Sequence, residues 1–160
     1  MFGFGKKTKP SLSSAEQLEE ALRLFNAFQS AFQAELPFSD RAQKREKDGL
    51  GEPYTSVEIE GYSLAVKHMS DCVRSLTAVV RSADPASDEF PDILTTLNGC
   101  AKIYALEVGS FVTATRLALA DANTGQSDTL ARSAEEAAGL ARTLAAEAAD
   151  AQQLAASAVA

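Results

Sequence analysis

The stretch ILTTLNGCAKIYALEVGSFVTATRLALADA, residues 93–122, decides the fold of this chain. Apolar or small side chains recur in it at every third or fourth position, which is the periodicity of one face of an α-helix. These residues are Leu97, Ala101, Tyr104, Val108, Phe111, Thr115, Ala118 and Ala122. The pattern predicts a long helix over about 88–122 with a buried face.

A second line of small and apolar residues starts two positions later in the same stretch. At about 100° per residue it lies on the far side of the predicted helix. Its largest or most central members are Ile103, Leu106, Thr113 and Leu117. A helix with two such faces lies either at the centre of its domain or against a partner. We therefore expect these four residues to form an interaction surface that is covered within the chain or by another chain.

Three further helices are predicted from their start signals and their apolar periodicity. Ser13 with Glu16, and Thr55 with Glu58, each match the capping box that opens a helix. Pro37 is expected to end the first helix, because proline disfavours helical backbone in the residue before it. The predicted helices cover about 14–36, 56–83, 88–122 and 128–158, with a polar linker at 37–55.

Similar helix lengths and short connections favour one bundle over a pile of short helices. The sequence predicts an all-α fold: an elongated antiparallel four-helix bundle in a single domain at 13–160, with a disordered basic N-terminal tail at 1–12. The first helix should bury Leu18, Leu22, Phe25, Phe32 and Leu36, and the second Ile59, Tyr62, Val66, Met69, Val73, Leu76 and Val80.

The N-terminal tail combines aromatic and basic residues and has no acidic ones. Phe2 and Phe4 alternate with glycines, and Lys6, Lys7 and Lys9 follow. Such a segment could place its aromatic rings in an interface while its lysines meet a membrane surface or an acidic partner. It could equally be a frayed terminus.

Composition narrows the classes of function. The 160 residues carry a net charge of −7, which argues against nucleic-acid binding. Two cysteines, Cys72 and Cys100, and no cleavable-looking signal segment fit a reducing cytoplasm. Because the two cysteines are equally far from the turn near Ala86, we expect them at the same level of a helix pair as buried, reduced thiols. Glu107 and Arg116 interrupt the longest apolar window, which argues against a membrane-spanning helix.

Catalytic and metal-binding signatures are missing from the sequence. His68 is the single histidine, and we expect it to be exposed and to bind no metal. No phosphate-binding loop or nucleophile motif occurs, so neither an enzyme nor a cofactor is expected. The carboxylates fall on predicted exposed faces, so none is expected to have a raised pKa. The basic residues Arg41, Lys44, Arg45 and Lys47 alternate with acids and are interpreted as a solvated face.

These observations favour a non-enzymatic interaction or scaffold protein that associates with itself or with a protein partner. The alternative is a bundle that binds or senses a small molecule. Its ligand would lie between helices near Tyr62, Met69 and Tyr104, where an apolar wall carries a few polar groups.

Overall fold

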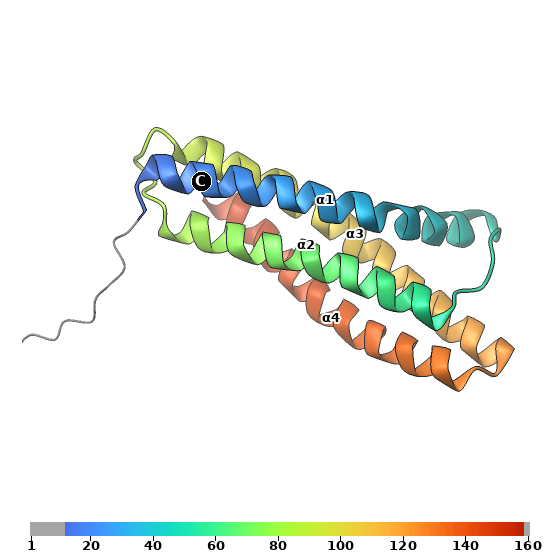
Figure 1. The fold of residues 1–160 in the computed structure, drawn as a ribbon. Coiled ribbons are helices and arrows are strands. Elements are labelled where there is room, and N and C mark those ends of the chain that lie inside the picture. Colours follow the sequence, from blue (N-terminus) through green and yellow to red (C-terminus); the bar gives the residue numbers. More distant parts are fainter. Residues whose placement is uncertain (1–11, 159–160) are drawn as a thin grey trace, which may run out of the picture.

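The computed structural model describes residues 12–158, which form four helices in an up-down-up-down bundle (Figure 1). The helices are α1 (Ser14–Asp48), α2 (Ser56–Ser82), α3 (Phe90–Gly125) and α4 (Asp128–Ser157). The predicted all-α bundle is confirmed, and both predicted capping boxes are formed. The tail at 1–11 lies outside the described residues.

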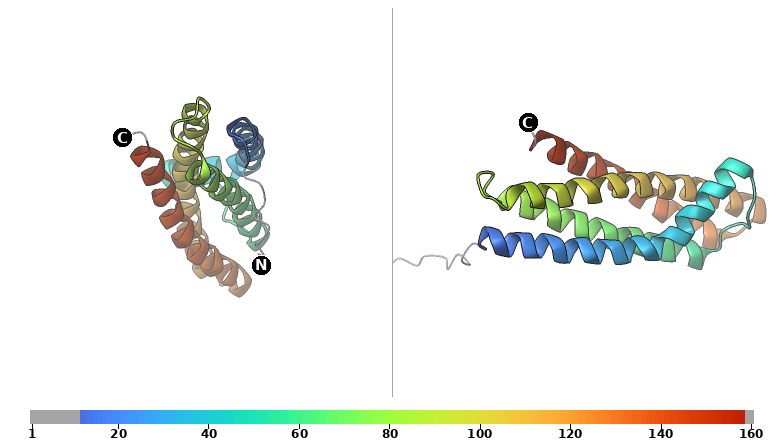
Figure 2. Two further views of the ribbon diagram at one scale, coloured as in Figure 1. Left: turned by 90° about the vertical axis from the view of Figure 1, so that its left-hand side faces the viewer. Right: turned by 90° about the horizontal axis from the view of Figure 1, so that it is seen from above.

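The four helices do not surround a common axis equally. Helices α2 and α3 each contact the other three helices, whereas α1 and α4 lie on opposite sides of this pair and do not contact each other (Figure 2). Each outer helix therefore fills a groove between α2 and α3. This arrangement explains why α3 has small or apolar residues on two faces: it is a central helix with three neighbours.

The predicted end of the first helix at Leu36 is wrong, because α1 continues through Pro37 to Asp48. A proline inside a helix removes one hydrogen bond and favours a kink, and the last part of α1 leans away from the first part (Figure 2). The helix ends at Gly49, which adopts the left-handed conformation with φ of 64°. The predicted linker 37–55 therefore shrinks to residues 49–55.

The predicted buried face of α1 is also wrong. Leu22 and Leu36 are exposed, and Leu18, Phe25 and Phe32 are only partly buried at the edge of the core. The buried line instead consists of Gln17, Ala21, Leu24, Phe28, Ala31, Glu35, Ser39 and Ala42. This line has the regular three-four spacing of a helix seam, but it contains small and polar residues, so it does not stand out by hydrophobicity.

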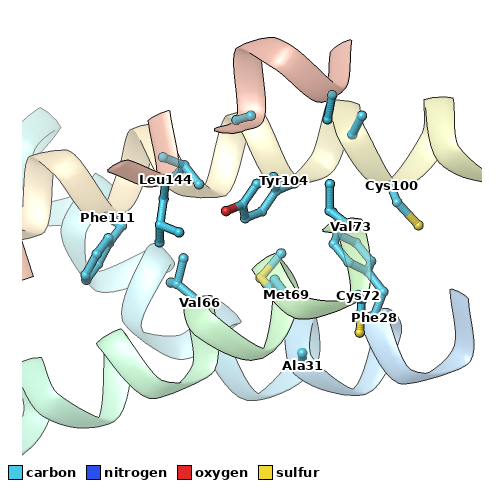
Figure 3. Packing of buried hydrophobic residues seen from close by; sticks show 14 of the residues in the cluster. Phe28, Ala31, Val66, Met69, Cys72, Val73, Cys100, Tyr104, Phe111 and Leu144 are labelled. Atoms are coloured by element: carbon cyan, nitrogen blue, oxygen red, sulfur yellow. The ribbon is translucent and has the colours of Figure 1, made fainter. Parts of the chain in front are cut away.

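The predicted seams of α2 and α3 are confirmed, since every member of both lines is buried. Figure 3 shows side chains of α2 and α3, among them Met69, Val73 and Tyr104, meeting in this core. Cys72 and Cys100 are both free and buried, as predicted. Burial raises the pKa of the Cys100 thiol to about 12, so the thiol stays protonated at neutral pH. Helix α3 ends at Gln126, which adopts the left-handed conformation with φ of 54°.

The predicted solvated face at the end of α1 is wrong for Arg41 and Arg45, which form ion pairs, whereas Lys44 and Lys47 are exposed as predicted. Arg45 donates two hydrogen bonds of 2.7 Å to Asp121 of α3. Arg41 pairs with Glu58 of α2. The guanidinium groups of Arg41 and Arg45 lie over the ring of Tyr54, at 4.5 and 5.0 Å from the ring centroid. These contacts fix the last turns of α1 against α2 and α3 despite the kink.

Helix α3 is the one helix among residues 12–158 that is long and apolar enough to cross a membrane, judged by length and composition alone. The central helix of a water-soluble bundle has the same properties. In this fold α3 is in contact with α1, α2 and α4.

Candidate binding groove between α1 and α3

A surface groove of about 530 Å³ separates the last turns of α1 from the middle of α3. It lies at the end of the bundle opposite the start of α1 (Figure 1). The small residues Ala42 and Gly109 keep it open, and a Cβ placed on Gly109 would meet no atom within 4 Å. The groove is lined by Ala42, Gln43, Glu46, Lys47, Leu106, Glu107, Gly109, Ser110 and Thr113.

The structure divides the predicted interaction residues of α3 into two sets. Leu106 and Thr113 both line the groove, and Leu106 is 72% exposed. Ile103 and Leu117 are instead partly buried against the core of the same chain. The predicted surface is therefore smaller than expected and centres on Leu106. The predicted tail residues Phe2, Phe4, Lys6, Lys7 and Lys9 lie outside the described residues.

A buried pair of carboxyl groups lies beneath this groove. Glu107 reaches the groove wall from α3, yet it is only 8% exposed, and Glu35 of α1 is fully buried next to it. Tyr62 of α2, also fully buried, completes the cluster. Both oxygen atoms of Glu35, Oε2 of Glu107 and the Tyr62 hydroxyl have no hydrogen-bond partner of standard geometry. Buried polar atoms are rarely left in this state, so the cluster calls for an explanation other than stability.

The electrostatics of the cluster follow from burial without a counter-charge. Burial, reinforced by the neighbouring Glu107 carboxyl, raises the pKa of Glu35 to about 9. Burial and the two acids also raise the pKa of the Tyr62 hydroxyl well above its usual range. Glu35 is therefore protonated at neutral pH, and both it and Tyr62 carry a proton that they can donate. The expectation that no carboxylate has a raised pKa is wrong.

Aromatic rings surround the cluster on the side of the core. The Phe38 ring stacks on the Tyr62 ring with 5.3 Å between the ring centroids. The Phe111 ring is tilted against the Tyr62 ring, with 4.9 Å between their centroids. Each of the three helices α1, α2 and α3 thus contributes one ring. The faces of such rings carry partial negative charge, which favours a cation nearby.

The rim of the groove carries weakly held polar groups. Gln43 donates hydrogen bonds of 3.4 and 3.3 Å to the hydroxyl groups of Ser39 and Ser110. Glu46 accepts a hydrogen bond from Arg116, and both side chains are more than half exposed. These groups can move at small cost, because exposed ion pairs contribute little to stability.

A third acid, Glu147 of α4, is only partly buried and has a different environment. It accepts hydrogen bonds from Ser70, from the Tyr104 hydroxyl at 2.8 Å and from Arg74 at 2.9 Å. Its charge is therefore balanced by a guanidinium group and by two hydroxyl donors. This cluster has the features of a structural tie between α2, α3 and α4.

The sequence contained a signal for the buried acids, but the signal was weak. Glu35 continues the three-four spacing from Phe28 and Ala31, and Glu107 follows Tyr104 by three positions. Recognising the first signal requires that the buried face of the first helix be assigned to Phe28 and Ala31, and not to its large apolar residues at 18, 22, 25, 32 and 36. Within residues 12–158 no three His, Cys, Asp or Glu residues are grouped so that they could hold a metal ion.

The residues proposed for an internal ligand site, Tyr62, Met69 and Tyr104, are fully buried in the hydrophobic core. All three belong to the packed hydrophobic core, where Figure 3 shows Met69 and Tyr104 between the helices. His68 is exposed, as expected.

Comparison of the chain with protein families, with curated proteins and with solved structures finds no match in any of the three. The function is therefore inferred from the groove itself.

Proposed function

We propose that the protein is a non-catalytic, self-associating scaffold in which the N-terminal tail of one copy docks in the α1–α3 groove of another. The observation that carries this proposal is the chemistry of the groove. An exposed leucine, Leu106, stands beside a buried acid, Glu107, that has an unpartnered oxygen atom. A suitable occupant combines an apolar side chain with a cation.

The tail has this combination. Two phenylalanines and three of the fifteen basic residues of the chain lie within residues 2–9, and none of its 22 acidic residues does. Phe2 or Phe4 would cover Leu106, and a lysine would approach Glu107. Burying one phenylalanine side chain contributes about 1.5–3 kcal/mol, enough for a reversible contact when combined with charge pairing.

Docking of a tail in the groove of its own copy would require an almost fully extended segment. From Ser14 to Glu35, the α1 residue next to Glu107, the helix spans about 32 Å at 1.5 Å per residue. The ten residues from Phe4 to Ser14 reach at most about 36 Å when fully extended. We therefore propose that Phe4 and the lysines that follow it meet the groove of a second copy. Because the two contacting surfaces differ, the association continues as an open chain or closes as a ring.

We propose the cytoplasm as the location. Two free, buried cysteines are typical of a reducing compartment. In this proposal the lysines of the tail meet a second copy and not a membrane surface.

The test uses sedimentation of the full chain over a range of micromolar concentrations. We expect association that increases with concentration, and monomers after deletion of residues 1–11 or after Leu106→Glu. Val57→Glu is the matched control, since Val57 is 74% exposed and lies outside the groove. A labelled peptide of residues 1–12 should bind the shortened chain, and Leu106→Glu should abolish this binding.

Two results would overturn the proposal. One is a full chain that stays monomeric at high micromolar concentration. The other is a peptide that binds vesicles of anionic lipid but not the shortened chain, which would assign the tail to a membrane surface.

A further inference from the structure

We infer that Glu35, Glu107 and Tyr62 form a binding site for a primary ammonium group, which enters from the α1–α3 groove. The inference deepens the proposed function, because the tail lysines carry this group. A small alkylamine carries the same group, however, so the site can be tested without the tail.

The first argument is the set of acceptors. Glu35 lies against Glu107 and Tyr62, and four oxygen atoms of the cluster have no hydrogen bond of standard geometry. No lysine or arginine of the described residues forms an ion pair with Glu35 or Glu107. An ammonium group has three N–H donors and no acceptor. It can therefore bond to both carboxyl groups and to the phenol oxygen without leaving a donor unpaired.

The second argument is the surroundings. Phe38, Tyr62 and Phe111 bring aromatic rings to the cluster from three helices. Aromatic rings attract a cation placed over their faces, and sites lined by such rings bind alkylammonium ligands. A divalent metal ion requires more oxygen ligands than two carboxyl groups and a phenol supply. The geometry thus favours an organic cation with a narrow, apolar stem.

The third argument is access. Glu107 lies in the groove wall. Gly109, two residues after Glu107, lines the same groove and leaves space above the backbone. An alkyl stem would lie along Leu106 and Ala42 with its ammonium group on Glu107. Glu35 lies behind Glu107 and would be reached last.

Binding should release a proton. Before binding, Glu35 is protonated. The ammonium ion allows Glu35 to ionise, so the proton of Glu35 leaves to solvent while the amine keeps all its own protons. The charged and titratable groups facing Glu35 are Glu107 on α3, Tyr62 on α2 and Asp40 on α1.

The experiment is calorimetric titration of n-butylammonium chloride into the chain lacking residues 1–11, whose four helices and core lie within residues 12–158. Titrations at pH 7 in two buffers of different ionisation enthalpy count the protons exchanged. We expect saturable binding with release of up to one proton. Glu107→Gln should weaken the binding at least about tenfold, because it removes one member of a buried charge pair. Glu35→Gln should abolish the proton release.

Matched controls separate this site from general charge effects. Glu46→Gln removes an exposed acid from the same groove, and Glu147→Gln removes the partly buried acid of the other cluster. Both should leave amine binding unchanged. n-Butanol, which has no charge, should not bind. Far-ultraviolet circular dichroism confirms that each variant remains folded.

The inference is overturned if folded protein does not bind butylammonium, or if Glu107→Gln binds it as tightly as the unaltered chain. Failure of the scaffold proposal is a different outcome. The scaffold proposal fails if the tail peptide does not bind the shortened chain, whether or not butylammonium binds. Peptide binding that survives Glu107→Gln would retain the docking surface and remove the ammonium site.

Discussion

Two acids of this bundle, Glu147 and Glu35, have nearly opposite environments. Glu147 is partly buried among α2, α3 and α4 and is bonded to Arg74, Ser70 and Tyr104. Glu35 is fully buried among α1, α2 and α3 against Glu107 and Tyr62, and neither of its oxygen atoms has a hydrogen bond of standard geometry. Both acids have a buried tyrosine nearby, so the difference comes from the missing cation.

This contrast separates structural from functional burial of charge. A buried carboxyl group with an arginine and two hydroxyl donors stabilises its surroundings or leaves them unaffected. A buried carboxyl group beside a second acid destabilises the fold, and such groups are concentrated at binding sites. The carboxyl groups beneath the α1–α3 groove thus lower the stability of the fold, whereas Glu147 on the α2–α4 side does not.

The largest expected effect tests the core that both clusters share. Phe111→Ala removes a fully buried ring that packs on Tyr62, and it should lower the free energy of unfolding by about 3–5 kcal/mol. Urea denaturation measures this change. The neighbour Val112, which is 43% exposed, is the control, and its change to alanine should cost under about 1 kcal/mol. Similar values for the two variants would contradict the assigned core.

The second prediction is that the unpartnered acid makes stability fall with pH. Glu35 has a folded-state pKa of about 9, and in the unfolded chain it ionises near pH 4.3. Between these values the folded protein keeps a proton that the unfolded chain releases, so stability decreases as pH rises. As the pH rises from 6 to 8, the free energy of unfolding of Glu35→Gln should therefore increase by about 2–3 kcal/mol relative to that of the unaltered chain. Parallel stability curves for the two proteins would show that Glu35 is not protonated.

The third prediction concerns the partnered acid. Glu147→Gln weakens the bond to Arg74 and replaces one acceptor oxygen by a donor that faces Tyr104 or Ser70. It should lower the free energy of unfolding by about 1–2 kcal/mol at neutral pH. Chemical denaturation at pH 7 measures this loss. A stabilised Glu147→Gln would make the two clusters equivalent and remove the contrast.

The smallest effect on stability is expected at the groove surface. Leu106→Glu replaces a side chain that is 72% exposed, so the free energy of unfolding should change by less than about 0.5 kcal/mol. Thermal unfolding of the shortened chain measures it without any contribution from association. A large loss would mean that Leu106 supports the core.

Sequence reasoning was most successful where hydrophobicity and periodicity coincide. The faces of α2 and α3 repeat large apolar residues at regular spacing, and their burial was predictable. The helix starts were predictable as well, because capping boxes are local. For α1 the two signals conflict: large apolar residues lie at its partly exposed edge, while its centre contains Ala31, Glu35 and Ser39.

The helix end and the buried acids were missed for different reasons. Contacts distant in sequence, above all Arg45 with Asp121, hold α1 in place beyond Pro37, and no local pattern indicates such pairs. Leu106 was found because it is a large apolar residue on an outer face. Glu35 was not found, because a glutamate in a polar, proline-containing segment resembles a solvated residue until its neighbours are known.

The most direct test of the contrast is a carbon-13 NMR titration of the side-chain carboxyl group of Glu35, assigned with Glu35→Gln. We predict that this group remains protonated at pH 7 and titrates near pH 9, and that Glu107→Gln lowers its pKa by removing the neighbouring charge. A Glu35 carboxyl group that titrates near pH 4 to 5, unaffected by Glu107→Gln, would contradict the account.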